Sequence, residues 1–320
     1  MTVTVVIPVR DRVHLIGRCL DSVAAQTRRP DRVVVVDNSS TDGTPGAVRR
    51  WSEAHADLPL TLLEEKRPGA SAARNRGLDA VDTDLVYFFD SDDEMLPDLL
   101  EKAIEAIGDA ELVYWKAEII TLSGQRRSKA FYTDSLLRRQ FYNSVLSTQA
   151  FLARTELVRR VGGWNEQAAV WNDWELGLRI AMARPRRAVV PEVLVRIHAQ
   201  EKSITGTAFS RRRGDWERTL AIVEEDIMQS PAPVADKRRM LDMLAYRRVV
   251  LAAAYRREGD CDAAASLLVD ALRAPHGTLS APQPTLSAPK PTLSARKRWL
   301  LRFIYHYTAL GGRAAYLLWR

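Results

Sequence analysis

The sequence predicts an α/β fold, a mostly parallel sheet with flanking helices, followed by a helical C-terminal region. Over the first 120 residues, short apolar runs rich in β-branched residues alternate with segments of helical periodicity. These runs are apolar on both faces, which is typical of parallel strands that helices cover from either side. From Trp216 to Ala274 the pattern is helical throughout.

The expected strands and helices follow one another in a regular order. The apolar runs that predict strands are TVTVVIPV, RVVVVD, LPLTLLEE and DLVYFFD. Helices are expected between them over Val13–Ala25, Thr44–Ala56 and Ser71–Ala80. A further helix is expected from Pro97, which suits a first helical position, because apolar residues recur after it at helical spacing.

Later elements have weaker signals. Ser123–Gln125 predicts a turn, and residues 145–153 form an apolar segment. Val170–Glu175 resembles the start of a helix, and Arg187–Ile197 predicts a strand. A turn at Glu258–Asp260 is expected to separate a long helix from the helical segment CDAAASLLVDALRA.

Four regions are expected along the chain: a domain over 1–210, a helical region over 211–274, a linker over 275–295 and a tail over 296–320. The linker contains the repeated motif TLSAPQP, TLSAPKP, TLSA. Its prolines exclude a coiled coil and favour an extended polyproline II spacer.

The composition is that of a globular protein, with 46% hydrophobic and 27% charged residues among 320. The chain has only two cysteines, Cys19 and Cys261, which argues against a disulfide framework and for the reducing cytoplasm. The first apolar run is short, has no basic region before it and ends at Pro8, so we expect a buried strand rather than a signal peptide.

The positive charge is confined to one end of the chain. Seven basic residues and no acid lie in 275–320, so this segment alone accounts for the net charge of +7. The body of the protein is therefore neutral, and no nucleic-acid partner is expected.

Polar residues follow three of the predicted strands. They are Arg10–Arg12 after the first, Asp37–Ser40 after the second and Asp90–Asp93 after the fourth. Ligands of such sheets bind beyond the carboxyl ends of the strands. The first turn lacks the glycines of a dinucleotide fingerprint, and no P-loop motif occurs, so a different ligand is expected.

The stretch FFDSDDE places four carboxylates within five residues. Two unit charges ~4 Å apart repel by about 4 kcal/mol at a partly buried site, so the repulsion must be relieved. From these residues alone, capping of the following helix and a divalent metal site are both open.

Seven segments together resemble one known family. They are IPVRDR, VVVVDNSSTDGT, RPGASAARNRGL, FFDSDD, GGWNE, NDWELGLRIA and VLVRIHAQEKSIT, and in this order they are similar to the inverting glycosyltransferases of family 2. The resemblance covers roughly residues 3–205 and implies the GT-A fold, a Rossmann-like sheet. It also implies metal-dependent transfer of a sugar from a nucleotide diphosphate sugar, with UDP the expected nucleotide. The acceptor would be a hydroxyl group of a lipid-linked or cell-surface glycan, as in polysaccharide biosynthesis.

The resemblance also implies a metal site that uses Mn or Mg. Asp92 corresponds to the direct metal ligand, and Asp90 lies near the ribose or the metal. Asp93 is a second candidate near the metal or the sugar. His198 aligns with a histidine near the diphosphate or the metal, although a single histidine is often structural.

The nucleotide pocket is implied by residues from three segments. Asp37 corresponds to the residue that reads the base, and its structural alternative is a cap for the helix at Thr44–Ala56. Arg74 and Asn75 correspond to a helix element beside the nucleotide, and their alternative is a solvated helix face. The residues expected to form the pocket wall are Pro8, Val9 and Arg10.

The catalytic base is implied by a Glu-Asp pair of the family, which here reads Asn172–Asp173. The second acid survives as Asp173, the expected base, with Glu175 as a fallback candidate. The alternative for Asp173 is an acid in the first turn of a helix. Trp171 is a candidate for stacking on an acceptor sugar.

Two other functions remain open at this level. One is a non-catalytic scaffold that binds nucleotide sugars. The other is a haloacid-dehalogenase-like phosphatase, whose Asp-x-Asp lies on the first strand and is followed by Thr or Val. Here the motif follows the fourth strand, and Glu94 stands two residues beyond Asp92.

The tail over 296–320 contains aromatic residues and six Lys or Arg residues without any acid. Arg302, His306 and Gly311 interrupt its apolar runs, so a spanning helix is not expected. We expect the tail to lie on the inner face of the cytoplasmic membrane. The alternative is that it docks on its own protein or on a second subunit, and a homo-oligomer is compatible with the sequence.

Overall fold

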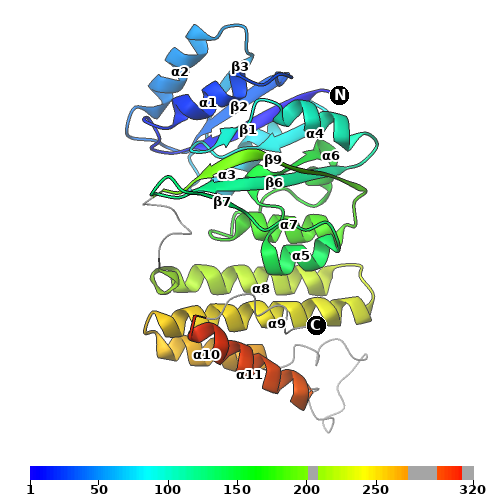
Figure 1. Cartoon of the computed structure of the whole chain (residues 1–320). Helices are drawn as coiled ribbons and strands as arrows, with labels where there is room; N and C mark the ends of the chain where they lie inside the picture. The colour runs from blue at the N-terminus through cyan, green and yellow to red at the C-terminus, as the bar shows by residue number, and fades with distance from the viewer. Residues whose placement is uncertain (201–207, 273–293, 312–320) are drawn as a thin grey trace. The chain divides into compact units, whose positions relative to one another are not determined.

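The computed structural model describes residues 1–200, 208–272 and 294–311 (Figure 1). The predicted linker over 275–295, except for its last two residues, and the tail beyond Gly311 lie outside the described residues. The chain divides into two compact units, Met1–Ser203 and Ile204–Arg320.

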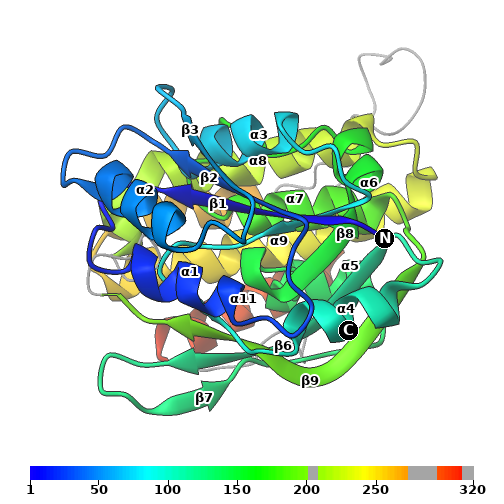
Figure 2. The same ribbon diagram turned by 90° about the horizontal axis from the view of Figure 1, so that it is seen from above.

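A mixed sheet organises the first unit. Its strand order is β3-β2-β1-β4-β8-β6-β9-β5, with β7 paired to β6. The strands are β1 Val3–Val9, β2 Arg32–Asp37, β3 Leu60–Glu64, β4 Leu85–Phe88, β5 Glu94–Met95, β6 Leu112–Ile120, β7 Arg126–Ser128, β8 Phe151–Arg154 and β9 Arg187–His198. The first four strands are parallel, β8 runs antiparallel to β4 and β6, and β6 is parallel to β9. Figure 2 shows β6, β7 and β9 side by side at one side of the sheet.

Helices cover both faces of this sheet and bury two separate cores. One core joins the sheet to α1 Ile16–Ala24, α2 Thr44–Ala54 and α4 Leu99–Ile107. The other joins it to α3 Ala70–Asp79, α5 Leu136–Asn143, α6 Thr155–Arg160 and α7 Asn172–Met182. Alternation along β1 explains both cores, because Val5 enters the first and Val6 enters the second. The predicted α/β class is thus confirmed.

Gly77 sets how closely α3 approaches the sheet. A Cβ atom at this position would lie 2.3 Å from Val6 Cγ1 and 3.3 Å from Val36 Cγ2. Real Cβ atoms do not come so close to a branched core side chain, so only glycine allows this packing.

The acid cluster does not cap α4, and Pro97 is not its first residue. Asp98 occupies the N-cap position of α4, so Pro97 lies just outside the helix, and the short strand β5, which contains Glu94, lies between α4 and Asp90–Asp93. The backbone N–H of Leu100 donates instead to Gln26 Oε1 at 3.0 Å. The capping explanation of FFDSDDE is therefore wrong.

The second unit is helical. Its elements are η3 Phe209–Arg212, α8 Arg213–Gln229, α9 Val234–Arg257, α10 Cys261–Leu272 and α11 Ala295–Ala309. The segment expected to be helical throughout is interrupted at Ser230–Pro233 and at the predicted turn Glu258–Asp260, where Gly259 has a φ of 88°. In the described ranges, no helix has the length and hydropathy that crossing a membrane requires.

Candidate active site

The register of the parallel strands aligns the predicted polar segments. Val9 of β1 pairs with Asp37 of β2, and Val6 pairs with Phe88 of β4. The loops that begin at Arg10, Asn38 and Phe89 therefore leave the sheet at the same edge. This convergence was expected from the parallel order alone.

Reciprocal hydrogen bonds lock the first two loops together. The backbone N–H of Thr41 donates to Asp11 Oδ1 at 2.7 Å, and that of Val13 donates to Asp42 Oδ2 at 3.0 Å. Asp11 and Ser39 have φ values of 50° and 59°. Such left-handed backbone in a non-glycine residue costs about 1–3 kcal/mol, which the surrounding bonds must offset, so the loops are preorganised.

Asp37 has one carboxylate oxygen without a partner. The side chain is buried, and Oδ2 accepts a hydrogen bond from the backbone N–H of Ser40 at 3.1 Å. Oδ1 is buried and has no hydrogen-bond partner. The first amide of α2 is bound by Asp42, since Thr44 N donates to Asp42 Oδ1 at 3.0 Å. Asp37 therefore does not cap α2, and its free oxygen can accept a hydrogen bond from a ligand.

The expected pocket wall lies next to Asp37. Pro8 and Val9 are buried in β1, and Arg10 follows them as an exposed residue at the end of the strand. Arg10 Nε lies 3.8 Å from Asp11 Oδ2.

The carboxylates of Asp90 and Asp93 are held by protein donors. Asp90 accepts from Arg74 Nη2 and from Gln149 Nε2, both at 2.7 Å. Asp93 is almost fully buried and accepts from the backbone N–H of His198 at 2.9 Å and from Gln149 Nε2 at 2.5 Å. One amide group thus bridges both acids.

Asp92 is much less engaged. Its carboxylate Oδ2 lies 3.7 Å from Arg12 Nε, and its backbone oxygen accepts a hydrogen bond from Arg18. Burial, followed by the charge of Asp90, raises the pKa of Asp92. Burial, with the charges of Asp90 and Asp92, raises the pKa of Asp93 well above its usual range. The protein alone therefore does not relieve the repulsion within the cluster.

This donor set fits a metal ion that also binds phosphate, and it does not fit an all-protein cage. Among the described residues, no three His, Cys, Asp or Glu side chains are placed to hold a metal together. Mg²⁺ commonly uses one or two carboxylates and completes its shell with water and substrate phosphates. The carboxylate of Asp92, which has only a 3.7 Å contact with Arg12, suits this arrangement. Both carboxylate oxygens of Asp90, in contrast, already accept hydrogen bonds from protein donors.

The imidazole of His198 is paired within the protein. Its Nε2 lies 3.3 Å from Glu94 Oε2, and Glu94 also accepts from Arg196 Nη1 at 3.0 Å. Burial, followed by the charge of Arg18, lowers the pKa of His198. The neutral ring therefore has a structural partner at Glu94.

Arg74 and Asn75 do not form a solvated helix face. Arg74 is buried, and its guanidinium contacts Asp90, lies 3.4 Å from Asn172 Oδ1 and stacks 4.3 Å from the ring centre of Trp164. Asn75 donates to the backbone oxygen of Trp164 and accepts from its N–H, both at 2.8 Å. Arg74 thus links the acid cluster to the start of α7.

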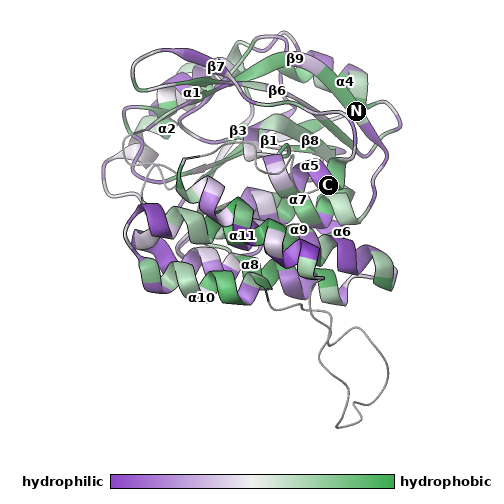
Figure 3. Cartoon of the chain, turned by 60° about the horizontal axis from the view of Figure 1, so that its bottom comes forward, coloured by the Kyte–Doolittle hydropathy of each residue, from purple (hydrophilic) through white to green (hydrophobic). Residues whose placement is uncertain are grey.

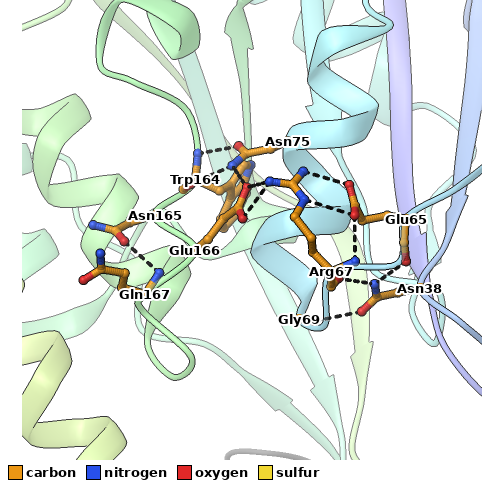
Figure 4. A network of polar contacts seen from close by, with 9 residues as sticks. All are labelled: Asn38, Glu65, Arg67, Gly69, Asn75, Trp164, Asn165, Glu166 and Gln167. Atoms are coloured by element: carbon orange, nitrogen blue, oxygen red, sulfur yellow. Dashed lines mark hydrogen bonds and ion pairs between the residues drawn. The ribbon is translucent and has the colours of Figure 1, made fainter.

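A second polar network fixes the loop before α7 to the sheet edge (Figure 4). Arg67 binds Glu65 through Nη2 at 2.8 Å and Glu166 through Nη1 at 2.9 Å. Asn38 donates to the backbone oxygens of Glu65 and Arg67 at 2.8 and 2.7 Å, and accepts from Gly69 N at 2.8 Å. The segment that follows Asp37 and the loop that leads to Asp173 are therefore connected.

Asp173 stands in the first turn of α7 and is partly exposed. Its Oδ1 accepts from the backbone N–H of Trp174 at 2.8 Å. The residue before the helix start, Trp171, is partly exposed and has a φ of 49°. The amine of Lys129 donates to the backbone oxygen of Ser144 at 3.0 Å; burial lowers its pKa, and the charge of Asp173 opposes this.

Glu175 is not placed to act on an acceptor. Its side chain is fully buried and forms a two-point ion pair with Arg179. The arginine also donates to the backbone oxygen of Val161. The Glu175 carboxylate is therefore held in the interior of the fold by its ion pair with Arg179.

Three residues that contact the acid cluster were not among the candidate site residues: Arg12, which was noted only as a polar residue after the first strand, Arg18 and Gln149. Arg12 lies in the motif IPVRDR and Arg18 six residues after it, and their positive charge could have indicated that they lie near the acids. Gln149 had no such signal, because it lies inside an apolar segment and η1, Thr148–Ala150, brings it to the cluster. Its backbone oxygen accepts from Tyr87 and Trp115 at 2.9 and 3.1 Å, which fixes its position.

The sheet order, the acids after β4 and the separate acid at the start of α7 define the GT-A class of glycosyltransferase fold. Residues 4–158 match the family model described as Glycosyl transferase family 2. The resemblance inferred from the motifs is confirmed. The family match leaves the haloacid-dehalogenase-like phosphatase alternative without support.

Known proteins agree with this assignment. The chain is 31% identical over 169 residues to Glycosyltransferase AglE of Haloferax volcanii, and the match covers 50% of this chain and 55% of AglE. The chain thus spans about half the length of this relative. TarS of S. aureus, in a complex with UDP-GlcNAc, has a TM-score of 0.62 and 17% identity, covering 84% of this chain and 91% of that one. The mannosyltransferase PcManGT of Pyrobaculum calidifontis, in a complex with GDP-Man and Mn²⁺, has a TM-score of 0.59 and 28% identity, covering 84% and 74%.

Proposed function

We propose that this protein is a metal-dependent, inverting glycosyltransferase that uses a nucleotide diphosphate sugar, with UDP the expected nucleotide, and a hydroxyl acceptor. The observation that carries the proposal is that one buried side chain, Arg74, bridges the acid cluster after β4 and the start of α7. Arg74 contacts both the acid cluster and Asn172, the residue before Asp173. An acceptor of a lipid-linked or cell-surface glycan is compatible with this site.

The two halves of the site have different tasks in this mechanism. The donor half would use the unpaired Oδ1 of Asp37 to accept from the base, and Pro8, Val9 and Arg10 to line the pocket. Arg74 would keep Asp90 fixed near the ribose. Arg12 and Arg18 would add positive charge on the side where the diphosphate leaves.

The acceptor half would carry out the proton transfer. The acceptor oxygen attacks the anomeric carbon as the bond from that carbon to the phosphate oxygen breaks, so the configuration inverts. Asp173 takes the hydroxyl proton, and the nucleoside diphosphate carries away the bonding pair. Trp171, partly exposed before the helix, could stack on the acceptor sugar.

Asp92 would hold the metal ion together with the diphosphate oxygens. A bound Mg²⁺ or Mn²⁺ would neutralise the charge that grows on the leaving group. The raised pKa of Asp92 supports this proposal, because a cation would stabilise the charged carboxylate that burial and Asp90 destabilise.

Calorimetry with UDP and GDP, each in Mn²⁺ or EDTA, tests the donor half. We expect nucleotide affinity to require the metal and to fall at least about tenfold in Asp92→Asn, a change of about 1.4 kcal/mol. Asp57→Asn, which alters an exposed acid paired with Arg29, is the matched control and should bind normally. Equal affinity of wild type and Asp92→Asn in Mn²⁺ would refute the role of Asp92.

Asp173→Asn tests the acceptor half and separates an enzyme from a binding scaffold. Loss of a general base typically lowers kcat about 10²- to 10⁴-fold. The variant should keep metal-dependent nucleotide binding and lose turnover, measured as nucleoside diphosphate release from a panel of nucleotide sugars with simple glycoside acceptors. If the wild-type chain binds nucleotide but forms no nucleoside diphosphate from any of the nucleotide sugars, the non-catalytic scaffold is favoured.

A further inference from the structure

Helix α11 has two different faces. Leu301, Ile304, Tyr305 and Thr308 are buried. This face packs against α9, where Arg256 lies 5.4 Å from the ring centre of Tyr305 and Lys297 pairs with Asp242. Figure 3 shows α11 beside α9 and α10 in the helical unit. One side of this helix therefore docks on its own protein, as the alternative for the tail predicted.

The other face presents a row of large apolar side chains. Trp299, Phe303 and Tyr307 are 66%, 44% and 40% exposed, and Leu310 is 89% exposed. Trp299 stacks on Phe303 with ring centres 5.8 Å apart, and Phe303 stacks on Tyr307 at 6.2 Å. The three aromatic residues are spaced by four and Leu310 follows Tyr307 by three, so all four lie on one stripe of the helix. We call these four residues the aromatic row.

The Lys and Arg residues of α11 are not accompanied by any acid on the same helix. Arg296, Arg302 and His306 are exposed on α11, and residues 294–311 contain no acid. The described part of the tail therefore combines exposed aromatic rings with cations, while its one lysine, Lys297, is turned to Asp242. A contiguous apolar patch of this kind marks an interaction surface rather than ordinary solvent exposure.

We propose that the aromatic row and the cations around it bind an anionic lipid surface. Trp and Tyr are favoured at the boundary between headgroups and acyl chains, where Phe and Leu insert further. Arg296 and Arg302 would contact the lipid phosphates, and this charge complementarity favours an anionic membrane over an apolar protein groove. The buried face of α11 remains on α9, so binding needs no unfolding of the helix.

Flotation of the full chain with vesicles tests this proposal. Vesicles of phosphatidylcholine with phosphatidylglycerol should carry the protein at low salt, and vesicles of phosphatidylcholine alone should carry much less. The double variant Trp299→Ala/Phe303→Ala should lose most of the bound fraction. Leu122→Ala, which removes a 66% exposed apolar side chain from the first unit, is its control and should float like wild type.

Charge reversal gives a second, independent measurement. Arg302→Glu changes the charge beside the row by two units, so we expect the partition coefficient to fall about 30-fold, since each charge near an anionic leaflet contributes about 1 kcal/mol. Arg49→Glu changes the net charge equally at an exposed position of α2 and should have little effect. Salt should weaken wild-type binding and reduce the difference between the two variants.

Three results would overturn the proposal. The first is a wild-type chain that stays with the soluble fraction at low salt. The second is an Arg302→Glu variant that floats as well as Arg49→Glu. The third is a wild-type chain that self-associates without lipid and becomes monomeric in Trp299→Ala/Phe303→Ala, which would assign the row to an interface between copies. If the double variant does not fold, as judged by circular dichroism, the two arginine variants decide.

Discussion

Gln149→Glu tests whether one amide holds the acid cluster together. The side-chain nitrogen of Gln149 donates to Asp90 Oδ2 at 2.7 Å and to Asp93 Oδ2 at 2.5 Å. Glutamate has nearly the same size and shape, but it removes both donors and places a carboxylate between two others. The substitution therefore changes the charge and leaves the packing intact.

The cost follows from these two contacts. A hydrogen bond to a charged group contributes about 1.5–3 kcal/mol, and two unit charges ~4 Å apart repel by about 4 kcal/mol at an effective dielectric constant of about 20. The variant can avoid much of this repulsion by binding a proton. We expect the free energy of unfolding of the first unit to fall by about 3–5 kcal/mol at about pH 7.5.

The loss should depend on pH with a definite sign. Repulsion raises the carboxyl pKa in the folded variant above its unfolded value, so the folded state binds the extra proton. Stability therefore returns as the pH falls, by about 1.4 kcal/mol per pH unit for each proton, until the unfolded carboxyl group also titrates near pH ~4. Between about pH 7.5 and about pH 6 the deficit should shrink by about 2 kcal/mol.

Urea unfolding at the two pH values, followed by tryptophan fluorescence, measures this difference against wild type. Gln125→Glu, in the exposed turn between β6 and β7, is the matched control and should show no pH-dependent deficit. The reasoning fails if Gln149→Glu loses less than about 1 kcal/mol at the higher pH, or if its loss is the same at both.

Three further substitutions test other parts of the first unit. Glu175→Gln leaves its partly buried partner Arg179 without a counter-charge and should lower the free energy of unfolding by about 3 kcal/mol in a urea titration; a stable variant without turnover would instead restore Glu175 as the base. Gly77→Ala should cost about 1–3 kcal/mol because its Cβ would meet Val6, whereas Gly214→Ala, where nothing lies within 4 Å, should be neutral or stabilising in the same thermal melt. Asn75→Ala leaves both backbone groups of a buried loop residue unpaired and should cost about 2 kcal/mol, and unchanged protease resistance of that loop would contradict this.

The parts of the fold with local signals were predictable. The apolar runs at β1, β2 and β4 are nearly continuous, and helical patterns separate them, so the parallel order and the common edge followed from the sequence. The acids at this edge could be found for the same reason. The ion pair of Glu175 also had a local signal, because Arg179 follows it by four residues on the helix.

Contacts between distant segments had no such signal. Gln149 reaches Asp90 because β8 pairs antiparallel with β4, and nothing in STQAF indicates that pairing. The bond between Asn75 and Trp164 joins residues 89 positions apart. Arg74 was expected to be solvated if it had no function, but the ring of Trp164 covers it and it is buried. Long-range packing decided each of these cases.

The two cysteines differ in a way that is useful for chemistry. Cys19 is buried below the acid cluster, with its Sγ 3.6 Å from the backbone oxygen of Asp90, and burial together with the nearby aspartates raises its pKa well above the usual range. Cys261 is exposed at the start of α10. Because the thiolate is the reactive form, a maleimide will label Cys261 in the folded protein and reach Cys19 only when α1 separates from the sheet edge. The unmodified chain thus has a single attachment point for a dye or a surface in its helical unit, and a second thiol whose labelling rate reports opening of the candidate active site.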